Sequence, residues 1–389
     1  MAADTGSGPS SPWPFEAHAW LDDQLVAVSR AALHVERPGA TPMLCFPAGD
    51  LRGDPPALRE LQLPAAPPGY VAFDPEDARL QLAFVDSVAG DAERDRTVKR
   101  FPAWGTSRDL IGLLDVRPDG DRSFVSTPRD NAANRHRGVV EGSQLLAQAI
   151  VAATRLTHGR RVVSASMLFM RAANTHEPLH LQLDELSGGR SFSAFAPQVR
   201  QTGKLCASGV MLLDATAPDV MRHAAPMPHT PGPYASEPLD MSVIGRDVRF
   251  VDGAYTSDPN APVGPPILDG WVRYRDVPED PALHLGLLAH FSGHASIATA
   301  MRPHAGIGQA QAHRTLSTAI NAIQISFHAA VRADRWMLYR HHSTFAGDGM
   351  THSECKVYGE DGALLASFSV EAMVRSMSND RPVHDRTSL

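Results

Sequence analysis

Two histidines at a helical spacing are the first feature of this sequence that could do chemistry. His290 and His294 lie four residues apart in the stretch LLAHFSGHASIA, which runs from Leu287 to Ala298. On a helix, this spacing places both imidazole rings on one face, where they could share a metal ion. A metal site would need further ligands, and the glutamate of an HExxH motif does not stand between these histidines. We therefore expect no metal here, and the histidines instead indicate the wall of a site of another kind.

Single side chains that could act as a base are the alternative to a metal. His294 could take up a proton near neutral pH, or it could be a helix-face histidine whose ring bonds to the backbone. Glu141 lies at the start of a predicted helix, where the positive end of the helix dipole stabilises a carboxylate. Pairing with that dipole could equally be its whole role. A polar loop before this helix could line the same site, with Asn131, Asn134 and His136.

The elements that would position these side chains occur twice. Apolar residues at helical spacing over 139–157 predict a long helix. Alternating apolar runs after it predict antiparallel strands, at 162–170, 178–186, 191–199 and 206–213. A second helix is predicted over 285–301, and strands are predicted after it at 322–331, 336–345, 351–359 and 363–375. Phe169 and Phe327 are separated by the same number of residues as Val199 and Val357, which indicates an internal duplication.

The composition of the chain limits the classes of protein to which it can belong. The chain has 389 residues, of which 43% are hydrophobic and 20% charged, and its formal net charge is -7. This balance has no basic block, so we expect no nucleic-acid partner. No uncharged apolar run reaches about 18 residues and no signal peptide is recognisable, so we expect no membrane insertion. Three widely separated cysteines, Cys45, Cys206 and Cys355, indicate reduced thiols in a cytoplasmic protein.

Domain boundaries are expected where the composition changes. Pro- and Gly-dense text with short apolar runs predicts a small β-rich domain before the two repeats. The expected order is a disordered tail (1–15), a small β-rich N-terminal domain (16–105), the first repeat (106–216), a Pro-rich linker (217–239), the second repeat (240–378) and a tail (379–389).

Six blocks of sequence, in one order, carry a resemblance to a known family. They are GSQLLAQAIVAA, FMRAANTHEPLHLQLDELSGGRSFSAFAPQVRQTGKLCASGVML, APMPHTPGP, MRPHAGIG, ISFHAAVRADRWMLY and VYGEDGALLASFSVEAMVR. Together they resemble the TesB-like acyl-CoA thioesterases (acyl-CoA thioesterase II family) over residues of about 108–377. The resemblance implies an α+β tandem (double) hotdog, in which two antiparallel sheets each wrap a central helix. Residues of about 20–104 are similar to a small β-rich domain family of unknown function, and no activity follows from that.

The family's activity is implied with its fold. Its members hydrolyse acyl-CoA to free acid and CoA in fatty acid metabolism, without a metal or an organic cofactor. An Asp on the second central helix, with a Thr and a Gln from later strands, commonly holds the attacking water. In this chain those positions fall on Gly293, Ile320 and Val370, so none of the three residue types is kept.

Other residues must then supply the chemistry if the site is active. The candidate catalytic residues are Glu141, His294, Asn321 and Gln324. Unpaired N–H groups at a helix N-terminus can hold a carbonyl oxygen as it becomes an oxyanion. The candidate substrate-binding residues are therefore Gly142, Ser143 and, on the second helix, Gly293.

Three hypotheses about function stay open at this point. The first is an acyl-CoA thioesterase in which a carboxylate or a histidine assists the attack of water. The second is a catalytically degenerate protein that binds acyl thioesters, and the third is a hotdog enzyme of another acyl reaction, such as hydration. We also expect a homo-oligomer, because sheet edges must be covered.

Overall fold

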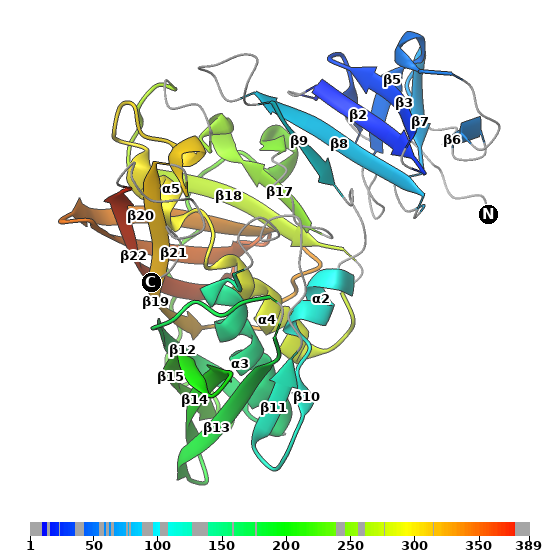
Figure 1. The fold of residues 1–389 in the computed structure, drawn as a ribbon. Coiled ribbons are helices and arrows are strands. Elements are labelled where there is room, and N and C mark those ends of the chain that lie inside the picture. The colour runs from blue at the N-terminus through cyan, green and yellow to red at the C-terminus, as the bar shows by residue number, and fades with distance from the viewer. Residues whose placement is uncertain are drawn as a thin grey trace. The chain divides into compact units, whose positions relative to one another are not determined.

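The computed structural model (Figure 1) describes residues 10–377, except for 14–15, 23, 36–42, 54–57, 60–61, 64–65, 75–76, 78, 88–95, 102–107, 127–138, 158, 176, 239–245, 256–260, 276 and 314. The expected C-terminal tail (379–389) and the loop residues Asn131, Asn134 and His136 lie outside the described residues. The chain divides into two compact units, residues 1–109 with 241–246, and residues 110–240 with 247–389.

The first unit is built from two antiparallel sheets, as expected for a small β-rich domain. One sheet contains, in spatial order, β1 (Ser10–Pro12), β4 (Leu33–Val35), β5 (Met43–Pro47), β7 (Tyr70–Phe73) and β6 (Gln62–Leu63). The other contains β3 (Gln24–Ser29), β2 (Glu16–Leu21), β8 (Leu80–Ser87) and β9 (Arg96–Phe101). Alternate residues of β2 are buried, as the pleat of a half-buried strand requires.

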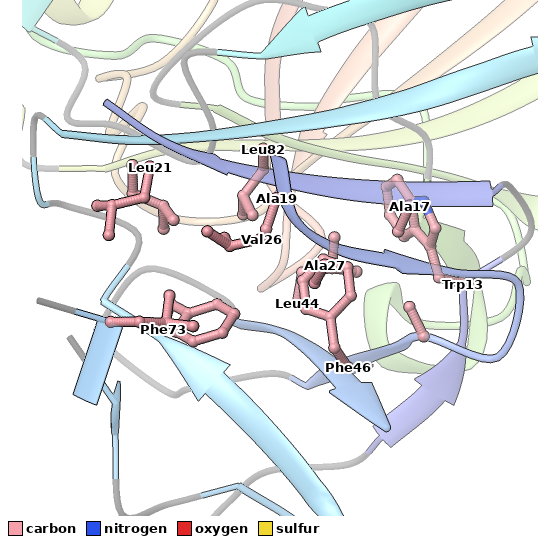
Figure 2. Packing of buried hydrophobic residues seen from close by; sticks show 13 residues of the cluster. Trp13, Ala17, Ala19, Leu21, Val26, Ala27, Leu44, Phe46, Phe73 and Leu82 are labelled. Carbon is pink, nitrogen blue, oxygen red and sulfur yellow. The ribbon is translucent and has the colours of Figure 1, made fainter. Parts of the chain in front are cut away.

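The core of this unit is a cluster of apolar side chains. Figure 2 shows Ala19, Val26 and Leu82 facing Phe46 and Phe73, and all five are buried. The structure differs from the expected disordered tail over 1–15, because residues 10–13 belong to this unit. Ser10–Pro12 pairs with Leu33–Val35, and the Trp13 indole, which is 5% exposed, is part of the core. Burial of a large aromatic surface is the physical reason why this segment is ordered.

The second unit contains one 13-stranded sheet. Its spatial order is β10 (Arg117–Pro118), β11 (Ser123–Ser126), β13 (Leu179–Gly188), β14 (Phe192–Gln201), β15 (Lys204–Asp214), β12 (Arg161–Phe169), β19 (Leu316–Phe327), β22 (Leu364–Ser376), β21 (Met350–Gly359), β20 (Met337–Gly347), β18 (Ile267–Tyr274), β17 (Arg246–Phe250) and β16 (Glu237–Pro238). The helices are α2 (Arg108–Leu114), α3 (Gly142–Leu156), α4 (Pro281–Phe291) and α5 (Ser296–Met301).

The order of the strands confirms the duplication. Strands β12 to β15 follow α3, β19 to β22 follow α4 and α5, and β12 pairs with β19 at the centre of the sheet. Phe169 and Phe327 end β12 and β19, while Val199 and Val357 lie in β14 and β21, the third strand of each set. Two antiparallel halves that each wrap a central helix form the expected double hotdog (Figure 1).

The two central helices pack closely against each other (Figure 1). A Cβ added at Gly286 of α4 would lie 2.7 Å from Val151 Cγ2 of α3, and one added at Gly293 would lie 2.4 Å from Ser143 Oγ. Because the later glycine meets the earlier residue of α3, the helices run antiparallel. The N-terminus of α3 therefore lies beside the C-terminal end of α4.

The second helix differs from the expectation of one continuous helix over 285–301. It begins earlier, at Pro281, where Asp280 caps the helix by accepting a hydrogen bond from the N–H of Ala282. It is then interrupted at residues 292–295, where Ala295 adopts a left-handed conformation with φ 66°. The alternating strand that follows also begins earlier than predicted, at Leu316.

The Pro-rich linker packs on part of the outer face of the second half of the sheet, at β18. The indole N–H of Trp271 donates to the carbonyl of Pro231 at 2.9 Å, and the Thr230 hydroxyl donates to Asp269 at 3.1 Å. Met227 packs on the buried cluster that contains Trp271 and Trp336. No helix in the described part of the chain is long and apolar enough to cross a membrane.

Candidate active site

One carboxylate and two imidazoles from opposite halves of the sheet meet between the central helices. The Oε2 atom of Glu141 lies 3.6 Å from Nε2 of His290 and 3.7 Å from Nε2 of His294. The two imidazole centroids are 5.6 Å apart. The side chains of His290 and His294 are 3% and 11% exposed, and that of Glu141 is 27% exposed. The carboxylate is therefore the member of the group that a substrate reaches most easily.

The position of Glu141 is fixed by the segment before α3. Glu141 is the N-cap residue of α3, with extended backbone angles (φ -67°, ψ 139°). The preceding Val140 donates its N–H to the carbonyl of Ala173 at 2.8 Å, and the amide of Gln201 holds Asn174 beside it. The Glu141 side chain makes no capping hydrogen bond to its own helix. Its carboxylate oxygens are consequently directed to the histidines and to whatever binds there.

The two histidines are held by the end of α4. His290 lies in the last turn of α4, and His294 lies in the break that follows it. The ring of His294 stacks on Phe291, with centroids 5.0 Å apart and planes 8° from parallel, while Phe291 packs edge-on against Tyr339 at 4.8 Å. The Tyr339 hydroxyl donates to the carbonyl of Leu288. These contacts fix the ring of His294 although its backbone is not helical.

The group of Glu141, His290 and His294 lies between the ends of two helix dipoles of opposite sign, the start of α3 and the end of α4. The N-terminus of α3, beside Glu141, carries partial positive charge. The C-terminal end of α4, which contains His290, carries partial negative charge. The two imidazole rings are close enough, at 5.6 Å between centroids, for charges on them to repel each other. Such a group can accept a proton from water and pass it on.

The glycine at the family's Asp position has a structural cause. A Cβ at Gly293 would lie 2.4 Å from Ser143 Oγ and 2.7 Å from Ser143 Cβ, so any side chain there requires a neighbour to shift. Ser143 is itself 1% exposed. A larger side chain at this position, such as Asp, would therefore force Ser143 or the backbone to shift. Ile320, at the family's Thr position, lies next to Gly293, at 3.5 Å from the same Cβ, so the two aligned positions are neighbours in space.

The start of α3 offers two backbone donors beside Glu141. Gly142 and Ser143 are the first two residues of the helix, and their N–H groups have no carbonyl one turn earlier in the helix to accept them. The N–H of Gln144 already donates to the carbonyl of Glu141 at 3.0 Å. Gly142 also allows close packing, because a Cβ there would lie 3.0 Å from the ring of Phe169. This terminus can hold a developing oxyanion.

The two candidates on β19 lie on different faces. The register of β19 against β22 shifts between Ile320 and Ala322, so Asn321 is the bulged residue. Its Oδ1 atom is buried and has no hydrogen-bond partner within the described residues. Gln324 is exposed and lies between Ile323 and Ile325, which are both 0% exposed. Because neighbours along a strand point to opposite faces, Gln324 points away from the central helices.

Three further residues belong to the description of this site: Val370, at the position aligned with the family's Gln, and His290 and Gln144. Val370 is buried and pairs with Ile323 of β19. Sequence reasoning treated His290 only as a metal ligand and did not consider Gln144. Gln144 is 1% exposed, and its Nε2 donor has no partner among the described residues. Its position three residues after Glu141, at the start of a helix, is the signal that could have identified it.

A metal site is not formed by the part of the chain that the structure describes. No group of three or more His, Cys, Asp or Glu side chains there could hold a metal ion.

Comparisons with known proteins match the second unit. A family model described as the acyl-CoA thioesterase N-terminal domain matches residues 132–213, and one described as the acyl-CoA thioesterase C-terminal domain matches residues 212–374. The chain is 28% identical to acyl-coenzyme A thioesterase 8 of Homo sapiens over 270 residues, which are 60% of this chain and 80% of that protein. It is 24% identical to acyl-CoA thioesterase 2 of Haemophilus influenzae over 286 residues, which are 69% of this chain and 97% of that protein.

Solved structures share the fold. A tesB protein of Mycobacterium avium subs paratuberculosis superposes with a TM-score of 0.59 at 21% identity, covering 69% of this chain and all (100%) of that one. The acyl-CoA thioesterase II TesB2 of Mycobacterium marinum superposes with a TM-score of 0.58 at 24% identity, covering 70% and 100%.

Proposed function

The chain belongs to the acyl-CoA thioesterase family, and on that premise we propose that Glu141 and His294 activate the water that attacks the thioester of an acyl-CoA. The products are the free acid and CoA. The observation that carries the assignment of residues is the placement of one carboxylate oxygen beside two imidazole nitrogens, at 3.6 and 3.7 Å. Both distances are longer than a hydrogen bond, so the oxygens of Glu141 keep acceptor capacity for a water molecule.

The reaction starts at the carboxylate. Glu141 accepts a proton as the water oxygen forms a bond to the thioester carbon. The carbonyl electron pair moves onto the oxygen, and the N–H groups of Gly142 and Ser143 stabilise this oxyanion. The tetrahedral intermediate then collapses and the carbon–sulfur bond breaks. His294, which receives the proton from Glu141, donates it to the departing CoA sulfur, so the group returns to its starting state.

The test is release of CoA by purified protein, read with a thiol reagent over a series of acyl chain lengths. We expect turnover by the native chain and a loss of kcat of about 10²–10⁴ in E141Q, the range that a general base contributes. E185Q is the matched control, because Glu185 is a surface carboxylate paired with Arg122 at 2.6 Å, away from the central helices. No CoA release from any chain length would overturn the proposal.

A second candidate function is binding without turnover. It is favoured by the replacement of the family's three polar residues by Gly293, Ile320 and Val370. Acyl-CoA binding by calorimetry, with no CoA release, would support it. A third is hydration of an unsaturated acyl-CoA, which also needs an acid and a base, and Glu141 with His294 supplies such a pair. Loss of the enoyl absorbance without thiol release distinguishes that reaction.

We also propose a setting for the enzyme. Cys45, Cys206 and Cys355 are all buried thiols without a disulfide, which supports a reducing compartment such as the cytoplasm. Turnover of acyl-CoA supports a role in fatty acid metabolism. A fluorescent fusion of the full chain would test the location.

A homo-oligomer is supported by an apolar area on the outer face of the first half. The residues exposed there include Leu168 (57%), Val210 (54%) and Leu212 (37%). They share one face of β12 and β15, because Leu212 pairs with Ser164 and Val210 pairs with Ser166. The linker contacts the outer face of the second half at β18, whereas these three side chains of the first half are open to solvent. We expect a second copy to cover them, so L168K should lower the mass measured by light scattering.

A further inference from the structure

The interiors of the two hotdog halves differ in polarity at equivalent positions. Leu183 and His341 are separated by the same number of residues as Phe169 and Phe327, so they are equivalent positions of the two halves. The strand pairing agrees, because Leu183 lies opposite Pro197 and His341 lies opposite Cys355 at the same points of their hairpins. Both residues are 0% exposed. One half therefore buries a leucine where the other buries an imidazole.

The imidazole ring of His341 makes no hydrogen bond within the described residues. Neither Nδ1 nor Nε2 has a hydrogen-bond partner, and the ring is packed against Tyr339 (6.4 Å between centroids) and Phe368 (5.7 Å). Leaving a buried donor or acceptor unsatisfied is unfavourable, because the group has lost its hydrogen bonds to water. A leucine, as in the first half, would avoid this cost. The imidazole is therefore explained best by a polar group that binds there.

A second unsatisfied group lies nearby. Ser296, the first residue of α5, is 2% exposed and its hydroxyl has no hydrogen-bond partner in the described part of the chain. Its carbonyl accepts a hydrogen bond from Ser353 Oγ at 3.1 Å, which places α5 over β21. Ser353 lies on the same face of β21 as Cys355, the residue that pairs with His341. By contrast, the hydroxyl of Ser343 on the same wall is satisfied by the carbonyl of His352.

The inner face of β20 and β21, which carries His341, Ser343 and Ser353, is continuous with the candidate active site. Ser296 comes two residues after His294 in the sequence. A series of ring contacts also joins them, from His294 to Phe291, then to Tyr339, and then to His341. His341 is therefore separated from the reacting group by two aromatic rings, those of Phe291 and Tyr339.

The chemistry of His341 limits the ligand. Burial lowers the pKa of His341 to about 3, so the ring is neutral and offers one donor and one acceptor. A carboxylate or phosphate would lose its hydration without gaining a charge partner. A hydroxyl, which also donates and accepts, matches both the imidazole and the hydroxyl of Ser296.

From this geometry we infer that His341 and Ser296 form a subsite for a hydroxyl group carried on the acyl chain, beyond the carbons next to the thioester. The inference rests on the proposed function and names its substrate class, hydroxylated acyl-CoAs. The subsite is a specificity determinant and takes no part in bond breaking.

The experiment compares dodecanoyl-CoA with dodecanoyl-CoAs that carry one hydroxyl at successive carbons. For the native chain, we expect one or more hydroxylated isomers to exceed the unsubstituted substrate in kcat/KM by about tenfold, the effect of one good buried hydrogen bond. H341L should abolish this ratio, and the leucine in the first half shows that the side chain fits such a position. Y339F is the matched control, because it removes a hydroxyl that already bonds to Leu288 and should keep the ratio.

Binding measurements separate this inference from the proposed function. The affinities of E141Q for the same CoA esters, measured by calorimetry, report the preference without turnover, with and without the added change H341L. Absence of CoA release in the native chain, with a preference in binding, would overturn the proposed function and leave the subsite standing. Equal kcat/KM and equal affinity for all isomers would overturn the subsite, and buried water would then be the only partner of His341.

Discussion

The Oε2 atom of Glu141 lies 3.7 Å from the Nε2 atom of His294, and the two residues belong to different halves of the duplicated chain. The antiparallel packing of α3 against α4 produces this contact, because it brings the start of one helix to the end of the other. Neither half contains the carboxylate together with the imidazoles. The proposed base and the proposed proton donor therefore come from different halves of the chain.

The two histidines are expected to differ in role. His294 is the more exposed, and we assign to it the proton that the CoA sulfur receives, whereas the more deeply buried His290 orients Glu141. H294Q should lower kcat for acyl-CoA by about 10²–10⁴, the usual contribution of a general acid. With an acyl ester of 4-nitrothiophenol, whose thiolate leaves without a proton, H294Q should regain most of the native rate. Steady-state kinetics with both esters provide the measurement.

H290Q is the comparison for this experiment. A positioning residue acts on the attack of water, so H290Q should lose activity to the same extent with both leaving groups. Equal losses for H294Q on the two substrates would contradict its assignment as the acid.

The contact between Gly293 and Ser143 should be measurable as a coupling in stability. G293A places a methyl group 2.4 Å from Ser143 Oγ, and overpacking of this kind costs about 1–3 kcal/mol. S143G alone should cost up to about 1 kcal/mol through the helix propensity of glycine. The double variant should be more stable than G293A, because the glycine removes the clash. Urea unfolding curves followed by circular dichroism would show this, and simple additivity of the two changes would argue against the contact.

His341 should make the protein sensitive to acid. Its pKa is about 3 when folded, against an ordinary value of 6.5, because burial disfavours the charged ring. Between these values the unfolded chain binds a proton that the folded chain does not, so stability is lost as the pH falls from about 6.5 towards 3. From pH 7 to pH 4.5 the loss assigned to this group is about 2–3 kcal/mol. H341L should remove that part of the pH dependence.

The readout is the urea midpoint of both proteins at pH 7 and at pH 4.5. Buried Asp269, whose pKa is raised by desolvation, contributes with the opposite sign in both proteins and cancels in the comparison. Parallel pH curves for the native chain and H341L would show that His341 does not resist protonation.

The close approach of the helices at Gly286 should also limit substitution. A Cβ there would lie 2.7 Å from Val151 Cγ2, so G286V must push α4 away from α3. Because the same packing aligns Glu141 with the histidines, we expect both a lower melting temperature and a lower kcat. G362A is a control at a surface turn, where an added Cβ meets no neighbour but a positive φ of 84° strains the backbone. A melting temperature lowered by G286V with kcat unchanged would separate the packing from the site.

The sequence by itself determined many of the helices and strands of the second unit, the duplication and the family. Helix 142–156 and strand Lys204–Asp214 fell where local periodicity placed them, because each period follows directly from one backbone geometry. It also identified Glu141 and His294 as candidate bases, since residue type and a helix end suffice for that inference.

The tertiary structure alone decided which of these residues meet. The contact of Glu141 with His290 and His294 depends on how two distant helices pack, and no local pattern encodes that. The bulge at Asn321 reversed the alternation along β19, which turned Gln324 outward although the sequence placed it beside the Thr position. The close contact of Gly293 with Ser143 joins residues from the two halves of the chain. Each of these is a long-range steric or pairing condition, and such conditions are satisfied only in the folded chain.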